Sequence, residues 1–437
     1  MLGRQTFRAV HRCHVATSQT DTMSAVESHL KSKLPAAVIA NFTQTHFTQV
    51  DGLRGMAILL VMIYHFCLPY VGFHGHGSGF MLQLAQGGWM GVDLFFVLSG
   101  FLITGILVET REQKHYFTNF LARRFLRIWP LYYLSLLGLL VVLPLVMASV
   151  PPELQSMRDK QGWFWLYAAN WLYAIEGGFS RTSGGYLWSL AVEEQFYLLW
   201  PLVVYALSSR NLLRTCITLL FVSLVSRIAL THLGVSSGSL YTMTFTHLDG
   251  LVVGASIAIC LRSANATASV VRLLPAVTVV AALGLVVIRL VDGDLFYWSR
   301  YMATYGYTLI AVLFGALLVT VLRTDSKASF SRVLFSNRFM TRCGKYSYAL
   351  YMVHVPVASL LHPLVMGASD KFKPLVGYEM TYVLFIAASF LVSWGLAVAS
   401  WNLFEKPILS LKRHFSYSPE GPKAGAVPDS GVRKQPG

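Results

Sequence analysis

Apolar segments of about 20 residues recur about ten times along this 437-residue chain, and no other feature restricts its fold as strongly. A helix of that length is about 30 Å long, which matches the hydrocarbon core of a bilayer. Only 13% of the residues are charged and 55% are hydrophobic, whereas a soluble domain is about 25% charged. We therefore expect an all-α polytopic membrane protein with about ten transmembrane helices, at residues 52–72, 88–109, 125–149, 187–208, 211–232, 242–262, 270–291, 300–323, 344–367 and 378–404.

One aromatic segment, WFWLYAANWLY at residues 163–173, is too short to cross a bilayer comfortably. Its Trp and Tyr side chains suit the headgroup layer, so it predicts one short interfacial or re-entrant helix.

Lysine and arginine residues indicate how the spans are oriented. The even-numbered connections between the expected spans are basic, whereas HGHGSG (74–79) has neither Lys nor Arg and DGD (292–294) is acidic. Because cytoplasmic loops carry the positive excess, we expect both termini in the cytoplasm. The chain then divides into a cytoplasmic N-terminal segment at 1–45, a membrane domain at 46–410 and a disordered, Pro- and Gly-rich cytoplasmic tail at 411–437.

The cysteines and the net charge narrow the class of site. The five cysteines are scattered, and none forms a CxxC pair, so we expect neither a disulfide framework nor a metal site. The net charge of +15 lies mainly in short loops beside apolar spans. That placement is typical of membrane topology, and we expect no nucleic-acid partner.

Ionisable residues inside the apolar spans point to a functional site. A charge at the middle of a transmembrane helix costs on the order of 2.5–3.5 kcal/mol, so each such residue is a functional candidate by default. They recur in most of the expected spans. This recurrence favours one shared polar cavity over residues that are satisfied separately in the core.

The segment LRGMAILLVMIYHF (53–66) carries Arg54 at one end and His65 near the other, eleven residues later. That spacing rotates a helix by about 1100°, roughly 20° past three turns, so both side chains share a face about 16 Å apart along the axis. The register suits a cytoplasmic anionic ligand that Arg54 holds and whose reactive end reaches His65. An equally good alternative is that neither residue binds a ligand: Arg54 would snorkel to the membrane surface, and His65 would be hydrogen bonded to a neighbouring helix.

The second and third expected spans add four candidates. Asp93 could hold a histidine in the tautomer that a general base needs, and Ser99 interrupts the apolar run of the same span. Arg124 and Arg127 lie one turn apart on one face. Arginine is a planar, bidentate donor, so this pair suits phosphate groups. Structural explanations remain open for these residues: Ser99 could serve helix packing, and the two arginines could be ordinary positive-inside charges.

Later spans carry further polar pairs. Glu193 and Glu194 are adjacent, so they cannot share a helix face, and we expect one to line the cavity while the other lies elsewhere. His247 and Asp249 fall in the outer half of the sixth expected span. The ninth carries two candidates on one face, Tyr351 and His354; a core histidine is the alternative for the latter.

Taken together, these segments resemble the acyltransferase-3 family of integral membrane O-acyltransferases. The matching stretches stand in the family's order from about residue 50 to 410, which identifies 46–410 as a membrane acyltransferase domain. They read LRGMAILLVMIYH, GVDLFFVLSGFLI, RRFLRIWP, LWSLAVEEQFYLLWP, LDGLVVGA, YSYALYMVHVP and WNLFEKP.

The resemblance implies transfer of an acyl group, usually acetyl from acetyl-CoA, to a hydroxyl of an extracytoplasmic acceptor, commonly a sugar. In that family the pair matched by Arg54 and His65 is needed for activity, and the pair matched by Arg124 and Arg127 is implicated. The remaining motif positions fall on Ser99, Trp188, Ser189 and Glu193, which favours Glu193 over Glu194. His247 stands where a larger cation is more usual, so the role of the sixth helix is less well defined.

These observations give a hypothesis for the mechanism. Acyl-CoA docks from the cytoplasm with its phosphates on Arg54, Arg124 and Arg127, as a co-substrate rather than a bound cofactor. His65 acts as general base, or carries the acyl group transiently, while Glu193, Asp93 and Asp249 steer the acceptor. The catalytic candidates are His65, Glu193 and Asp93, and the substrate-binding or structural candidates are Ser99, Trp188, Ser189, Glu194, His247, Asp249, Tyr351 and His354.

The expected setting is the plasma membrane, with an envelope glycan or glycolipid as acceptor. A second transfer step would fall to a separate extracytoplasmic transferase. The main alternative is a proton-coupled secondary transporter, whose proton relay would also need buried His, Asp and Glu; it predicts internal pseudo-symmetry. A ligand sensor is a third possibility, but it leaves the register of Arg54 and His65 unexplained.

Overall fold

The computed structural model describes residues 42–43, 46–74, 85–147, 149–179, 182–323, 330–369 and 373–417, which contain helices and no strand. Eight helical stretches in these residues are long and apolar enough to cross a membrane, so the prediction of an all-α multi-pass membrane protein is confirmed. These eight are Thr48–Cys67, Gly87–Thr110, Tyr116–Val146, Ser209–His232, Ala264–Asp292, Met302–Leu322, Arg338–Gly367 and Glu379–His414.

The helices follow one another with short connections. In chain order the α-helices are α3 (Thr48–His74), α5 (Gly91–Thr110), α6 (Tyr116–Leu137), α7 (Leu143–Val146), α8 (Pro152–Asp159), α9 (Gln161–Trp165), α10 (Ala169–Glu176), α11 (Trp188–Ala206), α12 (Ser209–His232), α13 (Ser237–Thr242), α14 (Asp249–Cys260), α15 (Ala264–Asp292), α16 (Tyr307–Leu322), α17 (Phe330–Ser336), α18 (Arg338–Ser369), α19 (Lys373–Ser400) and α20 (Lys406–Ser410).

Two of the ten expected spans are not among these eight helical stretches. The span expected at 187–208 is α11, whose 19 residues could cross a bilayer, but its adjacent glutamates lower its mean hydropathy. The prediction of a continuous helix over 242–262 is wrong. The chain forms a short 3-10 turn at Thr244–Thr246, leaves helical geometry at His247 and resumes as α14. The 12 residues of α14 rise only about 18 Å. The count of ten spans and the cytoplasmic termini stay predictions.

The structure also corrects three details: where the third span begins, how many helices the aromatic segment forms, and where the tail begins. The third span begins at Tyr116 rather than 125, because α6 continues helically through the charged residues that an apolar window leaves out. The aromatic segment 163–173 forms two short helices, α9 and α10, since Tyr167 between them has a φ of 52°. The tail expected to be disordered from 411 starts with a 3-10 turn, Leu411–His414. Residues 418–437 and 1–41 lie outside the described part.

The start of the tail is held against α6. Arg123 donates hydrogen bonds to the carbonyl oxygens of Lys412 (3.3 Å) and Phe415 (3.2 Å), and its guanidinium lies over the ring of Tyr417. Asn119 donates to the carbonyl of Ser416 at 3.1 Å. The tail therefore packs against α6 as far as residue 417, the last residue described.

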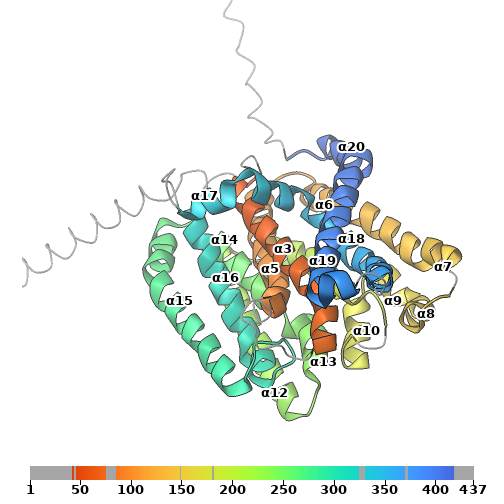
Figure 1. Ribbon diagram of the computed structural model, residues 1–437. Coiled ribbons are helices and arrows are strands. Elements are labelled where there is room, and N and C mark those ends of the chain that lie inside the picture. The colour runs from red at the N-terminus through yellow and green to blue at the C-terminus, as the bar shows by residue number, and fades with distance from the viewer. Residues whose placement is uncertain are drawn as a thin grey trace, which may run out of the picture.

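Glycines allow the two central helices, α3 and α5, to pack closely against α18 and α14, and Figure 1 shows their place in the bundle. A Cβ on Gly344 of α18 would lie 1.8 Å from the carbonyl oxygen of Asp51 on α3. A Cβ on Gly100 of α5 would lie 1.9 Å from the carbonyl oxygen of Leu251 on α14. Only a missing side chain permits such close backbones, as small residues do in membrane helix pairs generally.

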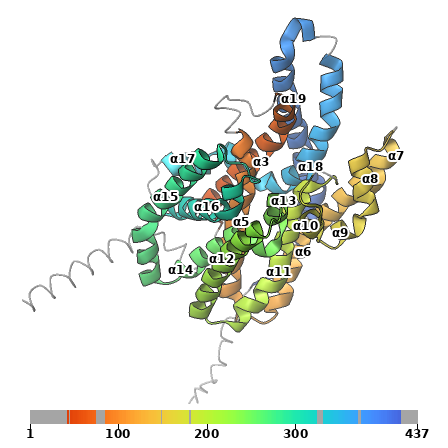
Figure 2. The same ribbon diagram turned by 90° about the horizontal axis from the view of Figure 1, so that it is seen from below.

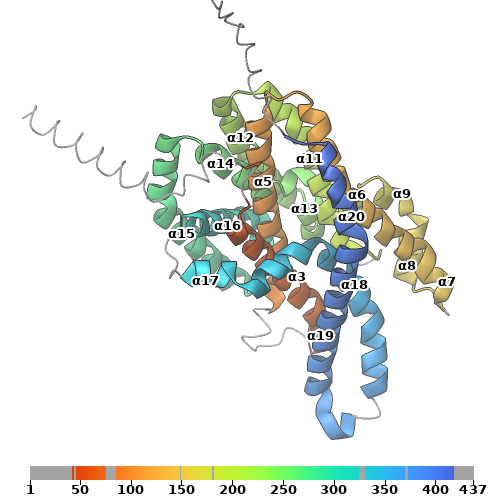
Figure 3. The same ribbon diagram turned by 90° about the horizontal axis from the view of Figure 1, so that it is seen from above.

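The remaining helices surround this centre. In Figure 2 α18 and α19 lie side by side and extend together beyond the rest of the molecule. Figure 3 shows α15 at one edge and α7 and α8 at the opposite edge, with α3, α5, α6, α11 and α18 between them. The candidate residues lie mostly on these five inner helices.

Candidate active site

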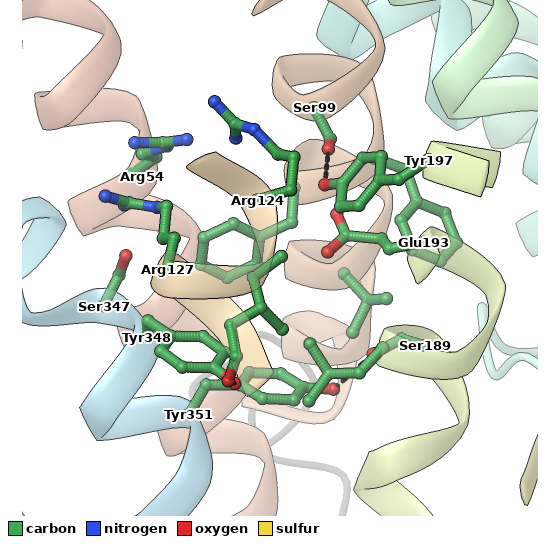
Figure 4. A pocket seen from close by; sticks show the side chains of 15 residues that line it. Arg54, Ser99, Arg124, Arg127, Ser189, Glu193, Tyr197, Ser347, Tyr348 and Tyr351 are labelled. Atoms are coloured by element: carbon green, nitrogen blue, oxygen red, sulfur yellow. Dashed lines mark hydrogen bonds between the residues drawn. The ribbon is translucent and has the colours of Figure 1, made fainter. Parts of the chain in front are cut away.

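A first cavity, which we call the arginine cavity, lies between α3, α5, α6, α11 and α18 and has a volume of about 90 Å³. Figure 4 shows its polar lining: the guanidinium groups of Arg54, Arg124 and Arg127 gather at one end, and Ser189 and Tyr351 lie at the other. The sequence candidates on its wall are Arg54, Ser99, Arg124, Arg127, Ser189, Glu193 and Tyr351.

The guanidinium end is strongly positive. Arg124 and Arg127 face the cavity from successive turns of α6, and Arg54 faces it from α3. An Asp51 carboxylate oxygen lies 3.9 Å from Nη1 of Arg54. In the part of the chain that the structure describes, the buried Nε of Arg124 has no hydrogen-bond acceptor. Lys412 from the tail lies within electrostatic reach of all three arginines. Such an excess of donors fits an anion of several charges, such as a group of phosphates.

The adjacent glutamates are separated as expected. Glu193 lines the arginine cavity, beside the hydrogen-bonded pair of Ser99 Oγ and the Tyr197 hydroxyl. Glu194 points away and accepts a hydrogen bond of 2.9 Å from the indole nitrogen of Trp129. The 100° rotation between neighbouring helical residues accounts for this division of one lining and one structural carboxylate.

A second cavity, the aromatic cavity, has a volume of about 560 Å³. That volume falls within the usual range of small-molecule sites. His65 and Trp188 line it, together with further rings that include Tyr64, Trp89, Tyr241 and Trp298. Glu153, from the start of α8, is the one carboxylate among the described residues of its lining.

Backbone carbonyls fix the proton positions of His65 and His354. Nδ1 of His65 lies 2.9 Å from the carbonyl oxygen of Val61, and Nδ1 of His354 lies 2.8 Å from that of Tyr351. A carbonyl only accepts, so each neutral ring carries its hydrogen on Nδ1. Nε2 of His354, 3.3 Å from Nδ1 of His65, is then an acceptor for the same hydrogen.

The consequence is a histidine whose second nitrogen is available as a base. Nε2 of His65 bears a lone pair, and none of the residues described here donates to it. His354 was a separate candidate from its sequence; the structure makes it the neighbour that helps orient His65.

The two cavities meet at a shared wall. Val92 and Tyr351 line both. The Tyr351 hydroxyl is hydrogen bonded to Ser189 Oγ at 2.6 Å and donates to the carbonyl of Tyr186 at 2.7 Å. Arg54 therefore opens into one cavity and His65 into the other. The expectation of one shared polar cavity is wrong, because periodicity along α3 says nothing of side chains that α18 and α11 place between its ends.

The histidine that Asp93 contacts is His247. Oδ1 of Asp93 lies 3.0 Å from Nε2 of His247. Both side chains are buried, and neither is in the lining described for the arginine cavity or the aromatic cavity. Aromatic rings of Trp188, Tyr241 and Tyr307 surround the imidazole. The family resemblance led us to expect a larger cation at position 247. The histidine found there packs among aromatic rings and contacts Asp93. A catalytic role for Asp93 remains a prediction.

Asp249 is neutralised by a residue that the sequence reasoning missed. Arg227 on α12, 0% exposed, places Nη1 2.6 Å from Oδ2 and Nη2 3.0 Å from Oδ1 of Asp249. The same guanidinium donates to Thr308 Oγ1 at 2.6 Å and to the carbonyl of Thr304 at 3.0 Å. The signal was available, since Arg227 is the lone charge within the apolar run LLFVSLVSRIAL (219–230). The expectation that Asp249 steers an acceptor has no support in this geometry.

The comparisons with known proteins agree with the motifs. The model of a family described as an acyltransferase domain matches residues 47–398. The chain is 28% identical over 382 residues to the peptidoglycan O-acetyltransferase OatA of Listeria monocytogenes, covering 84% of this chain and 56% of that protein.

Other relatives give the same result. The chain is 28% identical over 333 residues to the O-acetyltransferase OatA of Staphylococcus aureus, covering 72% of this chain and 51% of that protein. The chain is 29% identical over 376 residues to the putative peptidoglycan O-acetyltransferase YrhL of Bacillus subtilis, covering 82% of this chain and 54% of that protein. The chain spans about half the length of these curated relatives. No solved structure matches it. The domain match, which covers most of the chain, shows that this protein belongs to the acyltransferase-3 family.

Proposed function

We propose that this protein is a membrane O-acyltransferase that moves an acyl group from cytoplasmic acyl-CoA to a hydroxyl of an extracytoplasmic glycan or glycolipid. The names of its relatives favour acetyl as the group and an envelope glycan as the acceptor. The observation that carries the proposal is the wall at Tyr351, which has a cation-rich cavity on one side and a histidine with a free lone pair on the other.

The donor would occupy the arginine cavity. Arg54, Arg124 and Arg127 would hold the phosphates of acyl-CoA by charge-assisted hydrogen bonds. Glu193 lies on the way from the arginines to the wall, where its carboxylate would accept from an amide N–H of the pantetheine arm. In this assignment Glu193 positions the donor. That role replaces acceptor steering, the role we expected from the sequence.

The acceptor would occupy the aromatic cavity. Nε2 of His65 takes the proton of the acceptor hydroxyl while the oxygen attacks the thioester carbonyl. The carbon–sulfur bond then breaks, and the CoA thiolate leaves and takes up that proton. General-base catalysis of this kind contributes typically about 10²–10⁴-fold. The thioester must pass the wall, so Tyr351 has to move for each transfer. Acyl-CoA is a co-substrate here, and no permanently bound cofactor is needed.

The proposed place of action is the plasma membrane. Transfer can be completed on an acceptor in the aromatic cavity or handed to a separate extracytoplasmic transferase. Both routes need the same donor cavity and the same histidine.

The test uses the full chain in proteoliposomes, with radiolabelled acetyl-CoA on one side and envelope glycan on the other. We expect an alkali-labile label on the glycan, and His65→Ala should lower its rate of formation about 10²–10⁴-fold while CoA binding is kept. His232→Ala, which alters an exposed histidine at the end of α12, is the matched control. Full activity of His65→Ala would refute the assignment, and solute uptake without acyl-CoA would favour the transporter.

A further inference from the structure

The start of the C-terminal tail brings a fourth cation to the guanidinium end of the arginine cavity. Lys412 lies in the 3-10 turn Leu411–His414, and its side chain is half-buried. Its carbonyl oxygen accepts a hydrogen bond of 3.3 Å from Nη1 of Arg123 on α6, and the next residue, Arg124, lines the cavity. Figure 3 shows α20, which leads into this turn, beside α6. Backbone contacts therefore fix the turn close to the cavity.

Arg123 serves the tail rather than the cavity. Its guanidinium also donates to the carbonyl oxygen of Phe415 at 3.2 Å and lies 4.8 Å from the ring centroid of Tyr417. Of the three arginines in RRFLR (123–127), two thus face the cavity and one holds the tail against α6. This anchor leaves the side chain of Lys412 free to act on a ligand, because the turn is held through carbonyl oxygens.

The charges around Lys412 are those of a site for a polyanion. The groups that act on it most strongly are positive, namely Arg127, Arg124, Arg123 and Arg54. An ammonium group beside several guanidinium groups is repelled by them, and an anion with several charges bound between them reverses the sign of that interaction. Lys412 is therefore placed to bind the same anion as the arginines, as a point charge rather than a planar donor.

Acyl-CoA carries its phosphates at different distances from the thioester. The diphosphate joins the pantetheine arm to the adenosine, and the 3′-phosphate stands on the ribose, farther from the thioester. Arg54, Arg124 and Arg127 line the cavity that the pantetheine arm would enter, whereas Lys412 stands on the tail, outside the described lining. The outermost cation should therefore meet the outermost phosphate.

We infer that Lys412 is a donor-specificity residue that binds the 3′-phosphate of acyl-CoA, so that the tail completes the donor site. This inference rests on the proposed function, because it assumes acyl-CoA in the arginine cavity. It extends the donor site beyond residues 47–398, the part of the chain that matches the acyltransferase domain.

The experiment is calorimetric titration of the full chain in nanodiscs with CoA and with dephospho-CoA, which lacks only the 3′-phosphate. A hydrogen bond between charged groups contributes enough for about a tenfold change in affinity. We expect the parent to bind CoA at least about tenfold more tightly than dephospho-CoA. Lys412→Met should weaken the binding of CoA about tenfold and that of dephospho-CoA less than about threefold.

Two further variants separate this role from a general effect of charge. Lys412→Arg keeps the positive charge and should keep most of the preference for CoA. Arg413→Met removes an exposed cation from the same turn and should weaken neither ligand more than about twofold. Dephospho-CoA binding reports that the cavity is intact in every variant.

Two results would overturn the inference. Lys412→Met could weaken both ligands equally, in which case the lysine adds only general positive potential, or it could leave CoA binding unchanged. Acyl transfer from acetyl-CoA is measured on the same preparation. A selective loss of CoA binding in Lys412→Met, in a protein whose parent transfers no acyl group, would remove the proposed function alone. Transfer with a KM for acetyl-CoA that Lys412→Met does not change would remove only the role of Lys412.

Discussion

Separating the buried ion pair of Arg227 and Asp249 should damage the fold rather than the chemistry. Arg227 is 0% exposed and Asp249 is 1% exposed, and the guanidinium also serves Ser223, Thr304 and Thr308. Removing one partner leaves a charge with no counter-ion in a low-dielectric interior, which typically costs about 3–5 kcal/mol. We therefore expect Arg227→Met and Asp249→Leu each to destabilise the protein by about that amount.

The double variant Arg227→Met/Asp249→Leu should recover much of this loss, because both charges are then gone and the space is filled by apolar atoms. An unfolding entropy of about 2.1 cal/mol/K per residue makes each kcal/mol worth roughly 1 °C in a chain of this length. Each single variant should thus melt about 3–5 °C lower, and the double variant should melt above both.

Thermal unfolding of the detergent-solubilised protein measures these shifts, and acyl transfer is assayed well below the melting temperatures. Arg210→Met changes an exposed arginine at the start of the same helix and should melt within about 1 °C of the parent. One result would refute the reasoning: Asp249→Leu with an unchanged melting temperature and a raised KM for the acceptor. That outcome would return Asp249 to the role expected from the sequence.

Three further predictions follow from the same contacts. Gly344→Ala should lower the melting temperature by several degrees, since its Cβ would meet the carbonyl of Asp51 at 1.8 Å, whereas Gly138→Ala, with no atom within 4 Å, should not. Tyr351→Phe removes the hydroxyl hydrogen bonds that hold the wall, each worth about 0.5–1.5 kcal/mol. Because the wall should then move more easily, hydrolysis of acyl-CoA in the absence of acceptor should rise severalfold. An unchanged rate of hydrolysis would contradict a wall that moves. Arg127→Ala should raise the KM for acyl-CoA at least about tenfold with a smaller change in kcat, and an effect on kcat alone would contradict phosphate binding.

Helical periodicity was sufficient for much of the arginine cavity. The one-turn spacing of Arg124 and Arg127 and the adjacency of Glu193 and Glu194 depend only on residues close in sequence, and the structure has both arrangements as the spacing requires. The multi-pass fold follows from segment length in the same way.

Contacts between distant segments could not be read in this way. The division of the site depends on Tyr351 reaching Ser189, 162 residues earlier. His247, which stands at the helix break, contacts Asp93, 154 residues away. Arg227 illustrates a different failure, because a lone arginine in an apolar run is visible in the sequence while its partner is not.

The wall at Tyr351 also bears on the membrane itself. A single bore through the bilayer, lined by arginines at one mouth and wide enough for a sugar at the other, would let ions and protons run down their gradients. If the protein works as proposed, two adjoining cavities divided by a hydrogen-bonded phenol would keep the bilayer electrically tight between turnovers. Under the proposed function, the wall would let the protein join reactants from opposite compartments without conducting ions.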